Sequence, residues 1–228
     1  MDRSSFRLDD IEKTWIFDLD GTLIKSMHFH FQGWKKVLSK NNVNIEKLDF
    51  YEKEGTKLQE LLKYFFNKNN KSCNKNLLEN LIKKKNKYFI ENNKIIFYSG
   101  VRSLIKYLKK KNFYISIVTA GSRTRIINSI SSDFLKNFDT IITGDDCKKG
   151  KPFPDPYLLS LKHSELNKSE CIIVENAPLG IKAGNAAGIK TLGITNTLDK
   201  KYLKKAKYIV SSAKEIKKII DNINEKYP

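Results

Sequence analysis

Two aspartates, Asp18 and Asp20, are the side chains whose type and spacing first suggest chemistry. They follow the apolar run Trp15-Ile16-Phe17 and precede Gly21, a pattern that predicts a buried strand ending in a tight loop. Side chains at i and i+2 of a strand point to the same face, so both carboxylates should lie near the strand's carboxyl end. Two such charges repel each other and lose hydration, which favours binding of a hard cation. The alternative is a surface turn rich in Asp and Gly.

Polar side chains in three later loops extend this pattern. Thr119 and Ala120 follow an apolar run, and a hydroxyl with free amides at a helix N-terminus can bind an anion or simply cap the helix. Lys151 lies in a loop stiffened by prolines, where a fixed ammonium could offset clustered negative charge, although Lys-Pro also occurs in ordinary loops. Glu175 and Asn176 end another apolar run and offer an acid and an amide. Each of these signals is weak alone.

The spacing of apolar residues predicts two kinds of architecture along the chain. Residues 26–95 show only helical periodicity, for example apolar residues at i, i+3, i+4, i+7 and i+8 from Leu58. After residue 98, short apolar runs alternate with helical patterns, which predicts an α/β fold with a parallel sheet covered on both faces. Ligands of such sheets bind beyond the carboxyl ends of the strands, so the polar loops should share one edge. Beyond the opening strand, we expect strands at 114–118, 138–142, 171–174, 191–194 and 208–210, helices near 31–38, 58–66, 77–89, 101–111, 122 onward, 156–162, 179–187 and 213–224, and a loop at 67–76.

Composition limits the possible partners and compartments. The 228-residue chain carries a formal net charge of +18, but only five of its 43 basic residues are arginine, and the lysines are spread along the chain. This distribution favours a solvated basic surface over a nucleic-acid site, so no nucleic acid partner is expected. The cysteines at 73, 147 and 171 follow no CxxC spacing, which indicates free thiols in a reducing compartment. No apolar stretch is long enough to cross a bilayer, and the polar N-terminus is unlike a signal peptide, so we expect a cytoplasmic protein with no membrane partner.

Taken together and in order, four segments resemble the four motifs of the haloacid dehalogenase superfamily of phosphotransferases. They are DLDGT, TAGS, GKPFPDPY and VENAPLGIKAGNAAGI. The resemblance covers essentially the whole chain and is strongest to the β-phosphoglucomutase and phosphoglycolate phosphatase type. It implies a Rossmann-like core formed by residues 1–25 and 96–228, with a helical cap domain inserted at residues 26–95. It also implies Mg²⁺ as cofactor. Because the true dehalogenases of the superfamily lack the second aspartate, the resemblance implies phosphoryl transfer rather than dehalogenation.

The resemblance assigns a role to each matching residue. Asp18 resembles the nucleophile, which attacks phosphorus to form an aspartyl-phosphate. Asp20 resembles the general acid/base, and its backbone carbonyl together with the Asp18 carboxylate would bind Mg²⁺. Thr119, the amides near Ala120 and Lys151 would hold the oxygens of the transferring phosphoryl group.

The fourth motif departs from the commonest family pattern. Relatives usually carry two acids here, and the second is normally a direct metal ligand, whereas this chain has Glu175 followed by Asn176. An amide oxygen can ligate Mg²⁺ but brings no charge, and one or two carboxylates are usually sufficient. Asp18 and Glu175 could meet that requirement. The departure therefore affects metal affinity more than it affects the prediction of activity.

Two segments before residue 60 resemble the substrate-facing parts of β-phosphoglucomutases. His30 takes the position of a histidine that contacts the acid/base, or it merely packs in the hinge. Glu54-Gly55-Thr56-Lys57 resembles the specificity loop of the cap, in which glycine lets the backbone approach the site. Mutases place an arginine three residues after that glycine to hold a distal phosphate. Here the residue is Leu58, and Lys57 lacks the bidentate geometry of arginine, which favours hydrolysis of a monophosphate.

The sequence thus predicts a Mg²⁺-dependent phosphatase that hydrolyses a small phosphorylated metabolite, such as a sugar phosphate, as a monomer or weak homodimer. The first alternative is a β-phosphoglucomutase-like phosphomutase. The second is a basic regulatory or nucleic-acid-binding protein with impaired catalysis.

Overall fold

A six-stranded parallel sheet forms the centre of the structure. The computed structural model describes residues 13–92 and 94–226, so the first twelve residues of the predicted core lie outside the described part. The strands are arranged in the order β3-β2-β1-β4-β5-β6, and every neighbouring pair is parallel. The strand bounds are β1 Thr14–Phe17, β2 Tyr114–Val118, β3 Thr140–Ile142, β4 Cys171–Glu175, β5 Lys190–Ile194 and β6 Tyr208–Val210.

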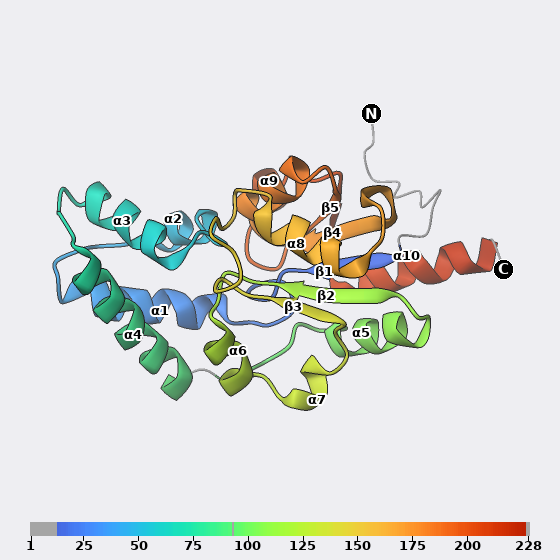
Figure 1. The fold of residues 1–228 in the computed structure, drawn as a ribbon, viewed down its shortest axis with the longest axis horizontal. Helices are drawn as coiled ribbons and strands as arrows, with labels where there is room; N and C mark the ends of the chain where they lie inside the picture. The colour runs from blue at the N-terminus through green and yellow to red at the C-terminus, as the bar shows by residue number, and fades with distance from the viewer. Residues whose placement is uncertain (1–12, 93, 227–228) are drawn as a thin grey trace.

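Helices cover both faces of this sheet, because the buried strands are apolar on both sides. Side chains alternate along each strand: Trp15 and Phe17 belong to one apolar cluster, and Ile16 belongs to another. The first cluster is completed by helices α5, α6, α7 and α10, and the second by α8 and α9 (Figure 1). The helix bounds are α5 Val101–Lys110, α6 Arg123–Ser129, α7 Ser132–Leu135, α8 Asp155–Ser164, α9 Pro178–Ala186 and α10 Ala213–Lys226, with short 3₁₀ turns at Lys168–Glu170 and Lys200–Tyr202.

Residues 27–92, which we call the helical block, form four helices with an apolar core of their own. Their bounds are α1 Met27–Ser39, α2 Lys47–Glu52, α3 Leu58–Lys68 and α4 Lys75–Asn92. Trp34, Leu62, Phe65 and their neighbours make a cluster separate from the two clusters of the sheet. The helical block lies beyond one end of the sheet, on the side away from the end of α10 (Figure 1).

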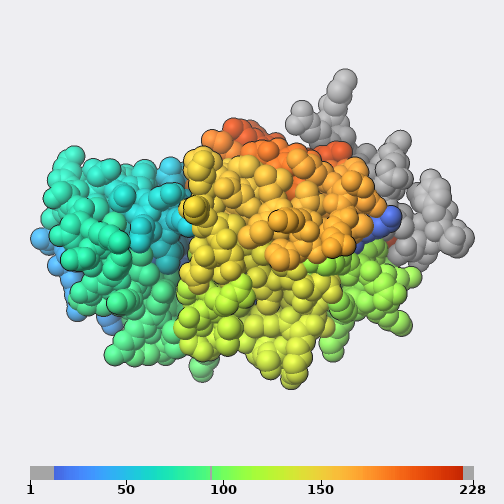
Figure 2. Space-filling model, viewed as in Figure 1, coloured from blue at the N-terminus to red at the C-terminus, as the bar shows by residue number. Residues whose placement is uncertain are grey.

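The chain crosses between the sheet and the helical block twice, at adjacent points. The amide of Lys25 donates to the carbonyl of Ile96 at 2.8 Å, so the two crossings run side by side. The two parts also meet where the loop between α2 and α3 packs against the loop around Lys151. Figure 2 shows the two parts meeting along a continuous seam. The predicted site lies at this seam.

The α/β fold class predicted from the sequence is confirmed. Strands and helices occur where alternation predicted them, with small differences in bounds; β3, for example, begins at Thr140, two residues after the predicted start. Two short helices, α2 and α7, had no sequence signal, because they span only six and four residues and helical periodicity needs a longer window. The division into core and cap at residues 25 and 96 stays a prediction.

Candidate active site

The carboxyl ends of three adjacent strands bring the predicted site residues together. Phe17 of β1 is in register with Ile117 of β2 and with Val174 of β4. The next residues along the three strands therefore lie side by side. Asp18 lies between the end of β2 and Glu175, and Thr119 follows directly after β2. From β1 the chain adds strands first on one side of the sheet, β2 and β3, and then on the other, β4 to β6. Parallel sheets bind ligands at the carboxyl ends of the strands beside such a switch point.

Lys151 links Asp18, which follows β1, to Glu175, which ends β4. Its Nζ donates to Asp18 Oδ1 at 2.7 Å and to Glu175 Oε1 at 2.6 Å, and its side chain is almost fully buried. Glu175 is also held by the Tyr157 hydroxyl at 2.8 Å and by the Ala177 amide, which donates to Oε2 at 3.0 Å. Both oxygens of Glu175 are thus occupied by protein donors. The geometry suits Glu175 to position Lys151 rather than to ligate a metal directly.

Burial and neighbouring charges set the protonation of this first group. Desolvation raises the pKa of Asp18 to about 7, although Lys151 opposes the shift. Burial would lower the pKa of Lys151, but the attraction of Asp18 and Glu175 outweighs it and holds that pKa well above its usual value. Lys151 is therefore a permanent cation beside the proposed nucleophile, which fits a role in stabilising negative charge.

Asp20 is held by four side chains from both parts of the molecule. Ser26 donates to Oδ1 at 2.6 Å, and His30 Nε2 lies 3.0 Å from the same oxygen. The guanidinium of Arg125 binds both carboxylate oxygens, at 3.1 and 2.5 Å. The Thr119 hydroxyl donates to Oδ2 at 3.3 Å. Burial alone would raise the pKa of Asp20, but the charges and hydrogen bonds of Arg125 and His30 together outweigh it, so this pKa lies well below the usual value and Asp20 is ionised.

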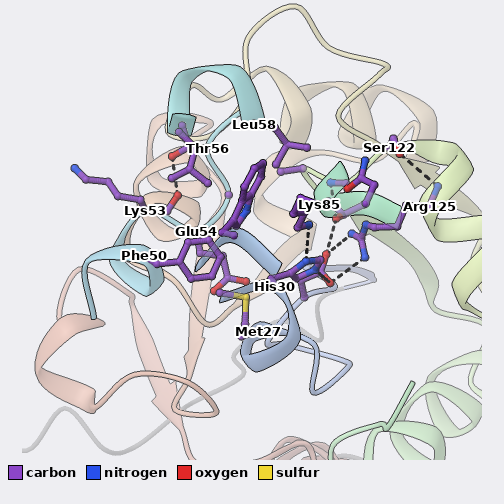
Figure 3. Close-up of a pocket in the computed structure, with 18 of the residues that line it drawn as sticks. Met27, His30, Phe50, Lys53, Glu54, Thr56, Leu58, Lys85, Ser122 and Arg125 are labelled. Carbon is purple, nitrogen blue, oxygen red and sulfur yellow. Dashed lines mark hydrogen bonds and ion pairs between the residues drawn. The ribbon is translucent and has the colours of Figure 1, made fainter. Parts of the chain in front are cut away.

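Lys85 of α4 extends the Asp20 network into the helical block. Its Nζ lies 2.7 Å from His30 Nδ1, and the His30 ring stacks on Phe89 with centroids 4.1 Å apart. Burial and the charge of Lys85 lower the pKa of His30 to about 3, so the imidazole is neutral. Burial and the charge of Arg125 lower the pKa of Lys85 to about 7. Figure 3 shows Lys85, His30 and Arg125 gathered on one side of the cavity.

Asn176 is completely buried and bonds to side chains from three other segments. Its Oδ1 accepts a hydrogen bond from the Thr22 hydroxyl at 2.7 Å. Its Nδ2 donates to Thr197 Oγ1 at 2.8 Å and to Glu54 Oε2 at 2.7 Å. The amide therefore joins the loop after β4 to the helical block. One lone pair of its oxygen is used by Thr22, so direct ligation of a metal by Asn176 stays a prediction.

The two predicted substrate residues in the loop after α2 lie at the seam, but with different surroundings. Gly55 has φ +87°, and a Cβ there would come within 2.8 Å of Lys151 Cδ, so only glycine fits this approach. Lys57 donates its Nζ to the carbonyl of Cys147. The ammonium of Lys57 is thus engaged with the sheet's loops and does not take the place of a phosphate-binding arginine in this conformation.

A cavity of about 60 Å³ lies between the helical block and the sheet. Its floor includes Asp18, Asp20, Thr119 and Ala120, and its roof includes Glu54, Gly55 and Lys85. Its apolar wall consists of Met27, Trp34, Phe50, Leu58 and Leu61. This space holds a few water molecules at most. A metabolite larger than a phosphoryl group therefore requires the helical block to move away from the sheet.

Three polar residues of this site were not predicted as site residues: Arg125 and Lys85 had no assigned role, and Glu54 entered only as part of the segment that resembles the specificity loop. Arg125 and Lys85 lie on helices, where each reads as an ordinary surface charge, and Glu54 lies in the turn after α2. One available signal was the spacing of Lys85 on α4, on the same face as the apolar Leu78, Leu81 and Phe89. A lysine on a buried face needs a polar partner, and here that partner is His30.

The fold and the arrangement of the four loops define a phosphotransferase-type hydrolase, and comparison with known families agrees. Residues 15–194 match the model of the haloacid dehalogenase-like hydrolase family. The chain belongs to this family, as the resemblance of the four segments implied.

Known relatives cover nearly the whole chain. The 2-deoxyglucose-6-phosphate phosphatase 2 of Saccharomyces cerevisiae is 32% identical over 231 residues, covering 92% of this chain and 91% of that protein. Hexitol phosphatase A of Escherichia coli is 26% identical, covering 90% and 93%. The solved structure of a β-phosphoglucomutase from Clostridium difficile superimposes with a TM-score of 0.79 at 28% identity, covering 94% and 96%. A putative β-phosphoglucomutase from Bacteroides vulgatus shares the fold, with a TM-score of 0.84 at 24% identity over 95% and 91%.

Proposed function

We propose that this protein is a Mg²⁺-dependent phosphatase that hydrolyses a small phosphorylated metabolite through an aspartyl-phosphate. The observation that carries the proposal is the placement of Asp18: it is buried, Oδ1 is fixed by Lys151, and Oδ2 has no hydrogen-bond partner. Asp18 lines a cavity that is also lined by Asp20 and Thr119. A carboxylate with one fixed oxygen and one unpartnered oxygen is suited to bind a cation and approach phosphorus.

Two half-reactions follow from this arrangement. In the first, an Asp18 oxygen forms a bond to phosphorus while the ester bond breaks, and Asp20 gives its proton to the leaving oxygen. In the second, water attacks the same phosphorus, its proton passes to Asp20, and the bond between phosphorus and Asp18 breaks. Lys151 and the amides after β2 hold the charge on the phosphoryl oxygens throughout.

Arg125 adds a condition to the first half-reaction. While the guanidinium binds both oxygens of Asp20, that carboxylate is ionised and cannot donate a proton. An anionic substrate competes for the same guanidinium, because arginine binds phosphate as well as carboxylate in a bidentate manner. Substrate binding is therefore expected to loosen the Arg125–Asp20 pair and let Asp20 take up its proton.

The donor set fits a magnesium ion. Within the described residues no three acid, histidine or cysteine side chains form a metal cluster by themselves. Mg²⁺ needs no such cluster, because one or two carboxylates, water and substrate phosphate usually complete its coordination. The unpartnered Asp18 Oδ2 and the carbonyl of Asp20 are the expected protein ligands. When bound, the ion would neutralise charge between the Asp18 carboxylate and the incoming phosphate.

Sugar phosphates are the substrate class best supported by the relatives, several of which are phosphatases named for phosphorylated sugars or sugar alcohols. We propose that the helical block acts as a cap that opens for substrate entry and closes for the reaction.

No helix among the described residues is long and apolar enough to span a bilayer. We retain the expectation of a cytoplasmic enzyme acting on a diffusible metabolite.

The second candidate is a phosphomutase, which the β-phosphoglucomutase structures favour. A mutase must bind a second phosphate firmly while the intermediate turns over. Leu58 supplies no charge at the expected position, and Lys57 is bound to the Cys147 carbonyl. Hydrolysis of a monophosphate is therefore the better fit.

A panel of sugar and polyol phosphates, assayed with and without Mg²⁺, tests the proposal. We expect Mg²⁺-dependent phosphate release from the wild type and none from Asp18→Asn. Isomerisation of a hexose 1-phosphate without net phosphate release would establish the mutase instead. An inactive wild type on every ester, combined with salt-sensitive binding of polyanions, would contradict the enzymatic assignment and favour the basic regulatory protein.

A further inference from the structure

Two residues that line the cavity at the seam each carry a buried carboxylate oxygen without a hydrogen-bond partner among the described residues. Among the described residues, Asp18 Oδ2 and Glu54 Oε1 are both buried and unpartnered. Asp18 directly follows β1 of the sheet, Glu54 lies in the turn after α2 of the helical block, and both line the same cavity. A buried anionic oxygen without a donor is costly, so two of them beside one cavity point to a shared cationic ligand.

The charges around Lys151 give the same indication. Three carboxylates are buried around Lys151: those of Asp18 and Glu175 bind its ammonium, and that of Glu54 accepts a hydrogen bond from the Asn176 amide. With all three ionised the group carries an excess of two negative charges. Arg125 is paired with Asp20, and the Lys57 ammonium binds the carbonyl of Cys147. A divalent cation would balance this excess.

Asn176 explains why the third carboxylate comes from the helical block. Its amide Nδ2 donates to Glu54 Oε2 at 2.7 Å, which orients the Glu54 carboxylate and leaves Oε1 unpartnered. An aspartate at position 176 has no donor to offer and would repel Glu54 at the same distance. Asn176, which stands where the fourth motif usually has its second acid, is thus in direct contact with Glu54, an acid supplied by the helical block.

We propose that Glu54 is a metal ligand contributed by the helical block, replacing the carboxylate absent at position 176 and coupling divalent-cation binding to closure of the block over the sheet. The inference rests on the proposed function for its choice of Mg²⁺. The cation joins Asp18 on one side of the seam to Glu54 on the other, so the closed arrangement binds it more tightly than the open one. The reciprocal follows from linkage: the cation stabilises the closed arrangement.

The loop that carries Glu54 is fixed in the closed arrangement by its neighbours. Gly55 lies against the Lys151 side chain, and the Thr56 hydroxyl donates to the Lys53 carbonyl at 2.7 Å. Lys57 reaches across the seam to Cys147. Glu54 therefore enters the site on a loop with defined contacts, which suits a ligand whose position matters.

Calorimetric titration of the full-length protein with Mg²⁺ alone, without substrate, tests the proposal. We expect Glu54→Gln to weaken Mg²⁺ binding about 10-fold or more, in line with the loss of a coordinating or supporting group. The control is Glu52→Gln, which removes the same charge two residues away on α2 and should bind Mg²⁺ as the wild type does. Circular dichroism and the melting temperature establish that each variant is folded.

The double variant Glu54→Gln/Asn176→Asp moves the carboxylate from the helical block to the sheet. We expect it to recover most of the Mg²⁺ affinity lost in Glu54→Gln. Small-angle X-ray scattering should show that Mg²⁺ reduces the radius of gyration of the wild type and of Glu52→Gln, but not that of the double variant. The double variant would then bind Mg²⁺ without closing the helical block over the sheet. A purely structural role for Glu54 would not produce this result.

Wild-type Mg²⁺ affinity in Glu54→Gln would overturn the proposal and leave Glu54 as a group that binds a substrate hydroxyl. Weakened binding that the double variant does not recover, or Mg²⁺-dependent compaction that persists in it, would overturn the coupling. These readouts need no turnover. A wild type that binds Mg²⁺ as described but hydrolyses no ester would contradict the proposed function and leave the metal site standing.

Discussion

The substitution Asp18→Asn should abolish turnover and yet stabilise the metal-free protein at alkaline pH. The nucleophile is lost, because an amide cannot form the acyl phosphate. The stability effect follows from burial, which raises the pKa of Asp18 from 3.8 to about 7. Between these values the native carboxyl keeps a proton that the unfolded chain has lost, so its contribution to stability falls as the pH rises. Above about pH 7 the native carboxyl is ionised, and the full cost of burying its charge is subtracted from the stability of the fold.

The magnitude follows from the size of the shift. A difference of about 3 pKa units corresponds to roughly 4 kcal/mol at 1.36 kcal/mol per unit, which is an upper limit for one group among interacting charges. Asparagine carries no charge and removes this penalty, while Lys151 keeps its bond to Glu175 at 2.6 Å. We therefore expect Asp18→Asn to exceed the wild type in stability by up to about 4 kcal/mol near pH 8, and by almost nothing near pH 4.

Urea unfolding in EDTA at the two pH values measures the difference directly. The exposed Asp133 provides a matched control, because Asp133→Asn should change stability by no more than about 0.5 kcal/mol at either pH. Excess Mg²⁺ should stabilise the wild type more than Asp18→Asn, since the ion binds the native carboxylate. The reasoning is refuted if Asp18→Asn is less stable than the wild type near pH 8 in EDTA, or if it retains ester hydrolysis.

Two further substitutions test the parts contributed by the helical block. Because burial lowers the pKa of Lys85 to about 7, the unfolded chain binds a proton that the native state lacks between about pH 7 and 10.5, so stability rises through that window. Lys85→Met should flatten that rise in urea midpoints and add up to roughly 4 kcal/mol near pH 7; an unchanged slope would contradict the lowered pKa. Gly55→Ala should lower kcat roughly 10-fold or more, because its Cβ would lie 2.8 Å from Lys151 Cδ and hinder closure. Gly100 has a similar φ of +86°, but a Cβ there would meet Lys214 and not Lys151, so Gly100→Ala should cost stability only; equal loss of kcat in both variants would contradict the contact with Lys151.

Much of the sheet half of the site could be predicted from the sequence. Asp18, Thr119, Lys151 and Glu175 each lie at the end of a strand or in the loop after one, and a parallel sheet brings such positions to one edge. The register of β1 with β2 and β4 confirms that neighbourhood. Their roles in catalysis and metal binding stay predictions, because the contacts show where the side chains lie and not what they do.

Asp18 and Asp20 were thus recognisable from the local sequence pattern alone, because a strand and its loop are set by neighbouring residues. What surrounds them was decided by tertiary structure. Arg125 reaches Asp20 across 105 residues of sequence, Lys85 reaches His30 across 55, and Glu54 reaches Asn176 across 122. Helical periodicity fixes the face on which such a side chain lies, but not the partner that faces it. That partner is set by how the helical block packs on the sheet, and it gives ordinary charged residues their place in the site.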